Sequence, residues 1–392
     1  MMLDAPFSPA PAPDLAKLIG SAIAGLESLP LYILAPVLML VVAVIIVTFV
    51  ALFDLFAVWL ERKVSARMQC RLGPMEVGPI RIGTRTFVGG VLQTVADGLK
   101  LLVKEDVIPR AADRPLYIIG PIVVFLGVFG LFVVIPFGPQ IIASDLNVGL
   151  FYVAAVGSLE AIGIMMSGWA SNNKWSLFGT MRAATQVVSY EIPLGLAFVT
   201  VIALAGTFSM TKLCDAQRGW VLNWYLFSNP FTAIAFVLYY IASLAQAKRS
   251  PFDLPEAESE LVSGFHTEYS GMRFAIFFLS EYAAMYAVSA VAAVVFLGGY
   301  YSGIAPLDDV IARGGVVANL IGAALIVAKS VFLVFVQMWL RWTLPRVRLD
   351  QIMHLCLKVL VPFGLACVVG SSLWQLLLGD RAAWFLPRAL FY

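Results

Sequence analysis

The sequence predicts an all-α, polytopic membrane protein with eight transmembrane helices. The chain has 392 residues, of which 61% are hydrophobic and 13% are charged, and its mean hydropathy is +0.90. A soluble domain carries about twice that share of charged residues. Apolar runs of about 20 residues, the length that crosses a bilayer, recur along the chain. Because lipid offers backbone groups no hydrogen-bond partners, each run is expected to be an α-helix.

Eight apolar runs define a membrane domain over residues 31–378, with an N-terminal extension (1–30) and a C-terminal tail (379–392). The first run is long enough to tilt strongly and to project beyond the bilayer, and we expect both. The extension lacks the basic segment of a cleavable signal, so the first span is expected to be retained. The runs lie roughly at 31–60, 116–137, 149–168, 187–207, 229–246, 273–298, 315–338 and 357–378.

Basic residues predict the orientation of the bundle. Residues 61–114 and the loops after the third, fifth and seventh spans hold nineteen Lys or Arg residues, and the other side holds six. The positive-inside rule therefore places these loops in the cytoplasm and both termini outside.

The first of the cytoplasmic loops contains an amphipathic segment, residues 88–105. Such a helix rests at the membrane surface, and its position would also suit the rim of an entrance for a lipid-soluble ligand. Its apolar face carries Val91, Leu92, Val95, Leu99, Leu102 and Val103, and Asp97, Lys100 and Lys104 lie off that face.

The polar exception in the chain is the stretch that begins at Lys248 and Arg249. Two prolines follow, and then six carboxylates within 29 positions: Asp253, Glu256, Glu258, Glu260, Glu268 and Glu281. If a helix begins at Pro255, Asp253 is its N-cap and Glu256 completes a capping box. Glu256 and Glu260 would share one face of that helix, with Glu258 on the other, so one cap does not use all three.

Five ionisable residues fall inside or at the edge of predicted spans: Asp54, Glu160, Glu191, Glu281 and Lys329. A charge at mid-bilayer costs about 2.5 to 3.5 kcal/mol, so they should face one another or internal water. They form either a proton path or structural pairs, for instance Lys329 with a carboxylate. Asp54 lies two helical turns before Glu61, on the same face. Glu61, Arg62 and Lys63, with Arg67 and Arg71, form either a basic anchor or the mouth of a cavity for an amphiphilic head group.

The chain has no visible redox centre of its own. Its four cysteines form no CxxC pair and match neither a zinc nor an iron–sulfur spacing, so free thiols are predicted. It has two histidines and no glycine-rich nucleotide loop placed after a strand, and no metal site is expected. Electrons, if involved, come from a partner.

Eight motifs occur in a fixed order along the chain. They are Trp59-Leu-Glu-Arg-Lys63, Arg71-Leu-Gly-Pro74, Ala96-Asp-Gly-Leu-Lys100 with Lys104-Glu105, Met166-Ser-Gly-Trp-Ala-Ser-Asn172, Arg182-Ala-Ala-Thr-Gln186 with Tyr190-Glu-Ile-Pro193, Ser250-Pro-Phe-Asp-Leu-Pro-Glu-Ala-Glu258, His266-Thr-Glu-Tyr-Ser-Gly271, and Arg341-Trp-Thr-Leu-Pro-Arg346 with Asp350-Gln351. From about residue 30 to residue 378 the chain closely resembles the membrane subunit called H of bacterial respiratory complex I, the counterpart of the mitochondrial first subunit.

The resemblance implies a multi-pass subunit at the heel of an L-shaped, proton-pumping NADH:quinone oxidoreductase in a bacterial inner membrane, with both termini periplasmic. The substrate would be a quinone, ubiquinone or menaquinone. NADH, FMN and iron–sulfur clusters are expected on partner subunits. The implied partners are peripheral-arm quinone-site and iron–sulfur subunits, small membrane-arm subunits and membrane lipid, and no nucleic acid.

The resemblance also implies two groups of site residues. Those expected to bind quinone or to line its entrance are Glu61, Arg62, Lys63, Arg71, Arg249 and Phe252. Those expected to couple quinone reduction to proton translocation are Asp253, Glu256, Glu258, Glu260, Glu268, Glu281, Glu160 and Glu191. The chain departs from the family pattern at Met75, where Asn is usual, in the longer and more basic segment 79–90, and at Asp54, near which the family pattern has no charge.

Two alternatives remain. The first is an anchor subunit of a membrane-bound hydrogenase, which binds no quinone, or of a reduced-deazaflavin dehydrogenase complex. The Glu-Arg-Lys ending of the first span and the His-Thr-Glu-Tyr-Ser-Gly run favour the quinone branch. The second is an ion-coupled secondary transporter. Inverted repeats and paired broken helices are the usual sign of a transporter, and the sequence contains no such repeat.

Overall fold

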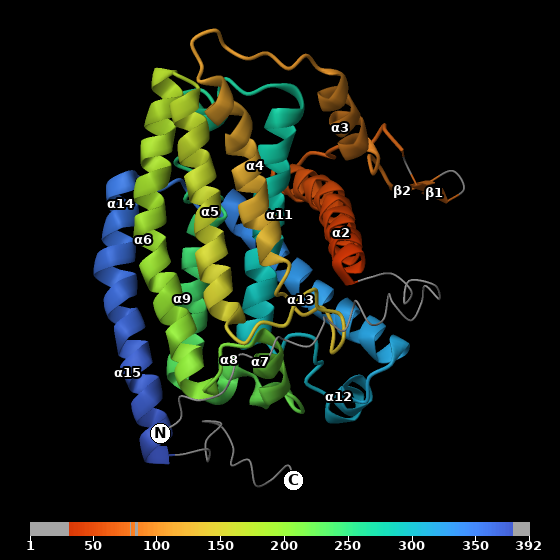
Figure 1. The fold of residues 1–392 in the computed structure, drawn as a ribbon, viewed down its shortest axis with the longest axis vertical. Coiled ribbons are helices and arrows are strands. Elements are labelled where there is room, and N and C mark those ends of the chain that lie inside the picture. The colour runs from red at the N-terminus through yellow and green to blue at the C-terminus, as the bar shows by residue number, and fades with distance from the viewer. Residues whose placement is uncertain (1–30, 79, 83–84, 379–392) are drawn as a thin grey trace.

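The computed structural model describes residues 31–78, 80–82 and 85–378, and the side chains of 31–35, 80–88, 258–259 and 378 lie outside that description. The prediction of an all-α membrane protein is confirmed, because long helices form a bundle (Figure 1). The long helices are α2 (Leu31–Met68), α4 (Arg114–Leu131), α5 (Gly149–Ala170), α6 (Lys174–Ala205), α9 (Pro230–Gln246), α11 (Gly271–Phe296), α13 (Val316–Thr343) and α15 (Val361–Leu378), the last preceded without a break by α14 (Leu349–Met353) and the π-helical η4 (His354–Leu360).

Seven helices in the described part of the chain are long and apolar enough to cross a membrane. An eighth apolar helix, α9, has 17 residues and is the only predicted span that is shorter than these seven. Asn229 and Thr232 form a capping box at its start, with Pro230 in its first turn. This cap fixes where α9 begins. The helix α9 is about 26 Å long, which is slightly less than the thickness of a bilayer core.

Several predicted spans begin or end at the wrong residue, because capping and backbone hydrogen bonding set helix ends, not hydropathy. The second span ends at Leu131 instead of 137, and the seventh continues to Thr343 instead of 338. The helix α2 continues to Met68, through its charged end. The helix α6 starts thirteen residues before the predicted 187, where the Asn173 side chain caps it, and it ends at Gly206, which has φ 66°. The last span starts at Leu349, and its π-helical stretch lies just before Pro362, which has no N–H to donate.

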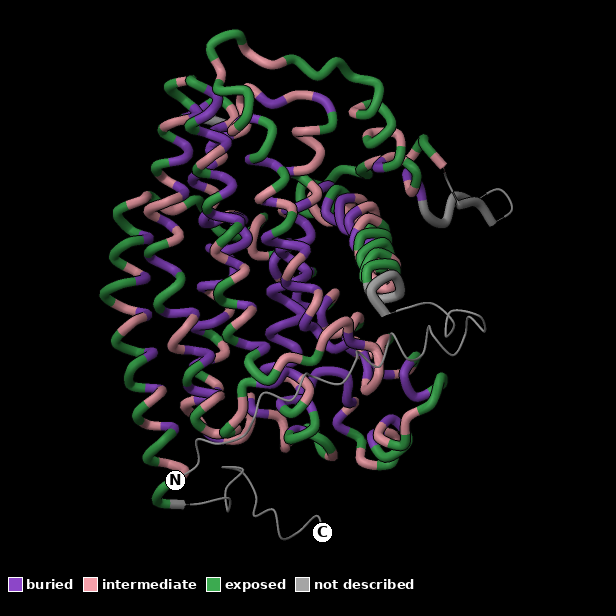
Figure 2. Tube along the Cα trace, viewed as in Figure 1, coloured by how far each residue is buried: buried purple, intermediate pink, exposed green. Residues whose placement is uncertain are grey.

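The centre of the bundle is α11. Every residue from Tyr282 to Phe296 is buried, and Figure 2 shows this helix enclosed by the others. Six alanines in that run let neighbouring helices approach closely, as small residues do in membrane bundles. The contacts of α11 include α2, α4, α9 and α13. Its first half therefore places side chains between α2 and α13.

Glycines bring α4 and α5 into backbone contact. A Cβ at Gly127 would lie 2.7 Å from the backbone nitrogen of Glu160, and a Cβ at Gly163 would lie 2.6 Å from that of Val124. Only hydrogen fits at these two positions, so the tight packing of the two helices depends on glycine. This packing fixes the depth of Glu160 in the bundle.

The first loop carries a short hairpin and an exposed helix. The strands β1 (Ile80–Ile82) and β2 (Arg85–Val88) pair antiparallel, a feature that the sequence analysis did not predict. The helix α3 (Gln93–Val103) occupies the middle of the predicted amphipathic segment. Its apolar side chains are exposed, with Leu92, Leu99, Leu102 and Val103 each more than half accessible. This apolar face suits contact with membrane or with another subunit.

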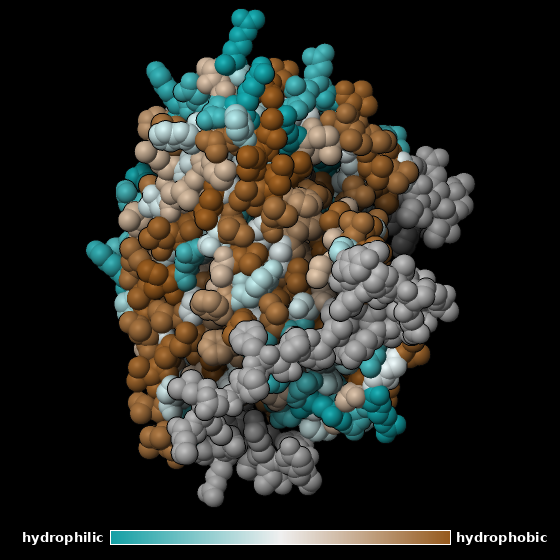
Figure 3. All heavy atoms as spheres, viewed as in Figure 1, coloured by the Kyte–Doolittle hydropathy of each residue, from teal (hydrophilic) through white to brown (hydrophobic). Residues whose placement is uncertain are grey.

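The outer surface of the bundle is predominantly hydrophobic. Figure 3 shows brown side chains along the sides of the long helices and hydrophilic ones mainly at the two ends of the bundle. The short helices α7 (Met210–Ala216), η2 (Val221–Asn223), α8 (Tyr225–Ser228) and α12 (Ala305–Ala312) lie at the opposite end. Several helices of membrane-spanning length and composition among the described residues, with apolar sides, make this a multi-pass membrane protein.

Candidate functional site

The acidic stretch folds into the bundle as the loop between α9 and α11. Lys248 and Val262 have φ values of 53° and 66°, and the Ser250–Pro251 bond is cis. Phe252 and Leu254 are buried between them. The only helical segments in this loop are α10 (Glu258–Leu261) and the single turn η3 (Gly264–His266).

No helix begins at Pro255, so the prediction that Asp253 and Glu256 form an N-terminal capping box is wrong. The first helical residue is Glu258. A Cβ at Gly264 would lie 1.7 Å from the carbonyl oxygen of Pro255. The chain therefore doubles back on itself here, and this tertiary contact overrides the local capping signal. The side chain of Glu258 lies outside the described part of the structure.

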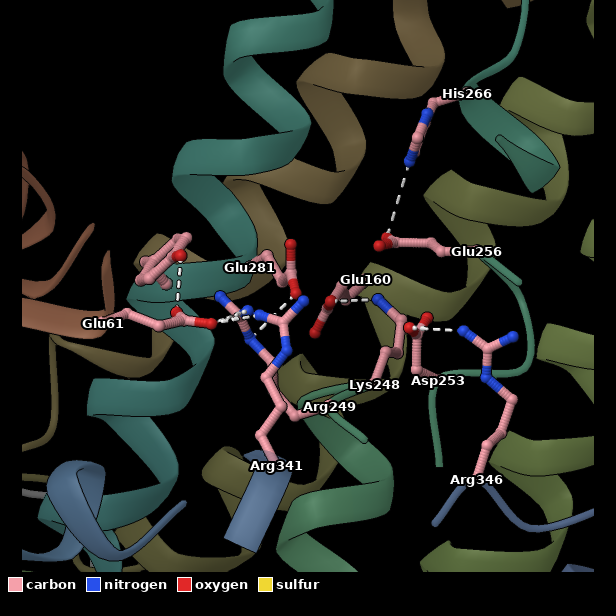
Figure 4. Close-up of polar contacts among 11 residues, drawn as sticks. Glu61, Glu160, Lys248, Arg249, Asp253, Glu256, His266, Glu281, Arg341 and Arg346 are labelled. Carbon is pink, nitrogen blue, oxygen red and sulfur yellow. Dashed lines mark hydrogen bonds and ion pairs between the residues drawn. The ribbon is translucent and has the colours of Figure 1, made fainter. Parts of the chain in front are cut away.

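A cavity of about 280 Å³ lies where this loop meets the adjacent ends of α2, α11 and α13. Its lining mixes charged and aromatic side chains, and Figure 4 shows several of the charged ones pointing toward one another. The charged residues of the lining are Glu61, Arg62, Arg249, Glu256, His266, Glu281 and Arg341, and the aromatic ones are Phe274, Phe277, Phe278, Tyr282 and Trp342.

Four of these charges form a cluster that is buried except at Arg341, whose side chain is 31% exposed. The Oε1 atom of Glu61 lies 3.4 Å from Nη1 of Arg249 and also pairs with Arg341. The Tyr282 hydroxyl donates to Oε2 of Glu61 at 2.6 Å, and its ring lies 4.2 Å from the Arg249 guanidinium. On its other side, Nε of Arg249 lies 2.9 Å from Oε1 of Glu281. Two carboxylates and two guanidinium groups thus balance one another (Figure 4).

Arg249 is the centre of this cluster, and its side chain is only 3% exposed. Burial disfavours its charged form, but the Glu281 and Glu61 carboxylates raise the pKa of Arg249 well above its ordinary value. Removing either carboxylate would leave the guanidinium less compensated. The cluster is therefore sensitive to any change in charge at its carboxylates.

A second pair in the cavity joins Glu256 and His266, whose Oε1 and Nε2 atoms are 3.8 Å apart. Burial opposes ionisation of both residues. The charge of His266 nevertheless lowers the pKa of Glu256, and the Glu256 carboxylate raises the pKa of His266 in return. The Nδ1 atom of His266 is buried without a hydrogen-bond partner among the described residues. Each of the two residues therefore favours the charged form of the other in a poorly solvated place.

Asp253 lies beside the cavity and is held on one side only. Its Oδ2 atom is 3.2 Å from Nη2 of Arg346, whereas Oδ1 is buried without a hydrogen-bond partner among the described residues. Burial and the neighbouring Glu256 carboxylate raise the pKa of Asp253 to about 6, and the charge of Arg346 acts in the opposite direction. Asp253 can therefore gain or lose a proton near neutral pH.

The ammonium group of Lys248 pairs with the Glu160 carboxylate from α5 (Figure 4). Both residues are buried. Lys248 stands next to Arg249 in the chain, so the same turn of backbone presents one cation to Glu160 and the other to the cavity. This pair links the centre of α5 to the loop that carries the site.

The other predicted quinone-site residues divide between the rim and the surroundings of the cavity. Arg62 lines the cavity and pairs at 2.6 Å with Asp97 of α3. The ammonium of Lys63 donates to the carbonyl of Pro74 at 2.5 Å and so holds the turn after α2. Arg71 contacts Gln69 at the surface, and Phe252 is part of the core. The structure thus brings together Glu61, Arg62 and Arg249, but not the other three.

The remaining acidic residues lie outside this cavity. Glu260 pairs with Arg182 at 2.6 Å, and Glu268 accepts a hydrogen bond from the side chain of Asn173. Glu191 lines a separate, mostly apolar cavity of about 300 Å³ among α5, α6, α9 and α11, together with Tyr190.

Of the two alternatives for the charges in the spans, structural pairing of Lys329 with a carboxylate does not occur among the described residues. Its ammonium group donates instead to three backbone carbonyls, those of Leu297, Gly299 and Tyr301.

Four residues that the sequence analysis did not assign to the site are part of it. Arg341 and Tyr282 complete the charged cluster, His266 pairs with Glu256, and Lys248 pairs with Glu160. Arg341 and His266 each open one of the eight motifs, which was a usable signal. Tyr282 gave none, because one tyrosine beside Glu281 in an apolar run is typical of a membrane helix.

Comparison with known proteins identifies the family. A family model described as NADH dehydrogenase matches residues 25–372. The chain belongs to this family.

Curated relatives share about half of its sequence. The chain is 50% identical over 348 residues to the H subunit of the NADH-quinone oxidoreductase of Chlorobaculum tepidum, with 86% of this chain and 93% of the relative covered. It is 45% identical over 369 residues to the protein of the same name from Anaeromyxobacter dehalogenans, with 91% of this chain and 87% of the relative covered. The predicted resemblance is therefore confirmed, and neither a hydrogenase anchor nor a transporter is favoured.

Proposed function

We propose that this chain is the membrane subunit of a proton-pumping NADH:quinone oxidoreductase and that its charged cavity receives the head group of a quinone. The observation that carries the proposal is the lining of that cavity. It combines aromatic rings with a balanced set of four charges, three buried or nearly so and one partly exposed, at one end of an apolar bundle. The names of the relatives support the same enzyme.

The lining suits the chemistry of a quinone, which has a flat apolar ring and two carbonyl oxygens. Phe274 and Phe278 offer apolar surface to the ring. Arg62, whose side chain is 42% exposed, and His266 offer hydrogen-bond donors to the oxygens. Reduction of a quinone to a quinol takes two electrons and two protons. In this proposal partner subunits carry NADH, FMN and the iron–sulfur clusters and supply the electrons, and this chain supplies position and charge.

The acidic loop supplies the coupling. If a proton leaves His266 for the substrate, Glu256 loses its cationic partner, and the pKa of Glu256 then rises. Asp253, with a pKa of about 6, lies close enough to feel that change. The charged cluster around Arg249 and the Lys248–Glu160 pair continue the line of ionisable groups toward α5. Proton transfer from His266 to the quinone would in this way alter charges deeper in the bundle. This change of charge is the step that couples quinone reduction to proton translocation.

The proposal extends to orientation and assembly. The cavity end of the bundle faces the cytoplasm, because nineteen Lys and Arg residues belong to that side, and both termini then lie in the periplasm of a bacterial inner membrane. Peripheral-arm quinone-site and iron–sulfur subunits would cover the cavity end. Small membrane-arm subunits and lipid would cover the apolar sides. The quinone is ubiquinone or menaquinone.

The entrance is tested with Arg62→Ala in the assembled complex. We expect the KM for quinone to rise about tenfold, which corresponds to about 1.4 kcal/mol, while NADH-dependent reduction of an artificial acceptor by the flavin arm stays unchanged. Arg67→Ala is the matched control, because Arg67 is exposed on the same helix but does not line the cavity. Equal quinone kinetics in the two variants would refute the assignment.

The coupling role is tested with Glu256→Gln. We expect NADH:quinone turnover and proton pumping to fall together by tenfold or more, because the variant cannot respond to a change at His266. Glu76→Gln, an exposed carboxylate in the first loop, is the control. A Glu256→Gln complex that assembles and retains full turnover and pumping would disprove this role for the acidic loop.

A further inference from the structure

Asp54 is a buried carboxylate that the site described above does not use. It lies on α2, and its residue is 5% exposed. Both of its oxygens are buried without a hydrogen-bond partner among the described residues. A buried carboxylate normally accepts several hydrogen bonds, and leaving one without any is costly. Packing and hydrogen bonding therefore do not explain why a carboxyl group occupies position 54.

Asp54 shares the buried face of α2 with Glu61. The residues Val50, Asp54, Ala57 and Glu61 on that face are each no more than 5% exposed. Seven residues of helix place Asp54 about 10 Å deeper in the bundle than Glu61. The positive charge of Arg249 interacts electrostatically with the Asp54 carboxyl group. Asp54 thus lies below the charged cluster and within its electrostatic influence.

The charged cluster is already balanced without Asp54. Glu61 and Glu281 contribute two negative charges, and Arg249 and Arg341 contribute two positive ones. The Glu256–His266 pair at the cavity is balanced as well. An ionised Asp54 would add a buried negative charge with no cation of its own, at a cost of several kcal/mol. While the cluster is balanced, Asp54 is therefore the neutral acid.

The helices packed against α2 place further buried polar atoms in the same region. Oε1 of Gln337 on α13 is also buried without a hydrogen-bond partner among the described residues, and the Tyr286 hydroxyl of α11 is buried with Ser330 of α13 as its neighbour. The Tyr286 ring centroid is 4.7 Å from that of Phe53, the neighbour of Asp54, and the Gln337 amide nitrogen donates to Ser289 at 3.1 Å. These atoms suit a few internal water molecules, each of which needs two to four polar partners.

We propose that Asp54 is a buried proton-binding site that exchanges its proton with the charged cluster through internal water. When a loss of charge at His266 leaves the Glu256 carboxylate uncompensated, Arg249 is drawn toward Glu256 and away from Glu281 or Glu61. The O–H bond of Asp54 then breaks and an O–H bond forms on the carboxylate that Arg249 has left. The negative charge moves to Asp54, and no electrons are exchanged. The charged and titratable groups that face this region are Glu61, Arg249, Glu281, Tyr282, Tyr286 and Arg341. The trigger rests on the proposed function, since quinone reduction supplies the charge change.

The bound proton is tested by infrared spectroscopy of the purified complex, without turnover. A protonated carboxyl group has a C=O stretching band that a carboxylate lacks. We expect Asp54→Asn to lose the intensity of one such carboxyl per chain, and Asp54→Leu to lose the same. Asp145→Asn is the control, because the Asp145 carboxylate, unlike that of Asp54, accepts hydrogen bonds from Ser209 and Thr211, near the other end of the bundle. An unchanged band in Asp54→Asn would overturn the proposal.

The exchange is tested by the difference spectrum between the NADH-reduced and oxidised complex. We expect a change in a protonated carboxyl band in the wild type and its absence in Asp54→Asn. Identical difference spectra would overturn the exchange. If Arg62→Ala and Glu256→Gln keep normal quinone turnover while the static band of Asp54 persists, the proposed function fails and the proton-binding site stands. The two failures are thus distinguishable.

Discussion

Two regions along α13 bury cations in opposite ways. Arg341, near the end of the helix, shares the carboxylate of Glu61 with Arg249 beside the cavity. Lys329, about 18 Å earlier along the same helix, donates to the backbone carbonyls of Leu297 at 2.5 Å, Gly299 at 3.0 Å and Tyr301 at 2.6 Å. Its ammonium also lies 4.4 Å from the Trp224 ring.

The different partners of Lys329 and Arg341 show which buried ion contacts can change with protonation. Carbonyl groups do not titrate, so Lys329 is held by partners of fixed charge at the end of α11, where the helix dipole favours a cation. Asp308 nearby is held likewise, by four hydrogen bonds from the chain around Gly219, Ser302 and Gly303. The partners of Arg341 and Arg249 are carboxylates, which do titrate. The partners of Lys329 and Asp308 therefore keep their charge, whereas the partners of Arg341 and Arg249 can change theirs.

The largest expected effect on turnover comes from Arg249→Met. This change leaves Glu61 and Glu281 without their shared cation, so we expect a loss of about 3 to 5 kcal/mol of stability and failure of the complex to assemble or turn over. Thermal unfolding and native gel electrophoresis measure it. Arg182→Met is the matched control, because its pair with Glu260 is exposed and is worth under about 1 kcal/mol. Equal stability and assembly of the two variants would show that the cluster around Arg249 contributes no more than an exposed ion pair.

Glu160→Gln is expected to have the next largest effect. It leaves the buried ammonium of Lys248 unpaired, at a cost of about 3 kcal/mol, and it should slow turnover because Lys248 adjoins Arg249. Lys248→Met combined with Glu160→Gln removes both charges and should recover most of the stability. A double-mutant cycle by thermal unfolding measures the coupling. If the losses in free energy of unfolding of the two single variants add up in the double variant, Lys248 and Glu160 are not energetically coupled.

Asp253→Asn tests the pH response of the loop. The pKa of Asp253 is raised from 3.8 to about 6, so the folded state holds a proton that the unfolded state releases near pH 4. Stability from this group is therefore present at low pH and is lost as pH rises from about 4 to about 6. We expect Asp253→Asn to remove this slope and to flatten the acidic limb of the quinone-dependent rate profile. Superimposable pH profiles would contradict the prediction.

Lys329→Met should change turnover least. Three neutral carbonyls lose a donor, so we expect a lower unfolding temperature and a cost of about 1 to 3 kcal/mol. Quinone reduction and pumping per assembled complex should match the wild type. An assembled Lys329→Met complex with turnover reduced tenfold would break the comparison, because it would assign the Lys329 region to the coupling path.

The sequence by itself determined the class of the protein and the rough positions of its spans, because the cost of exposing polar backbone to lipid is local and depends on composition. It also singled out Asp54, Glu160, Glu281 and Lys329 as charges needing an explanation. Only the tertiary structure decided their partners. Arg249 meets Glu61 across 188 residues, and Lys329 meets carbonyls of α11 instead of a carboxylate. Such contacts depend on how whole helices pack, and no local pattern of residues contains that information.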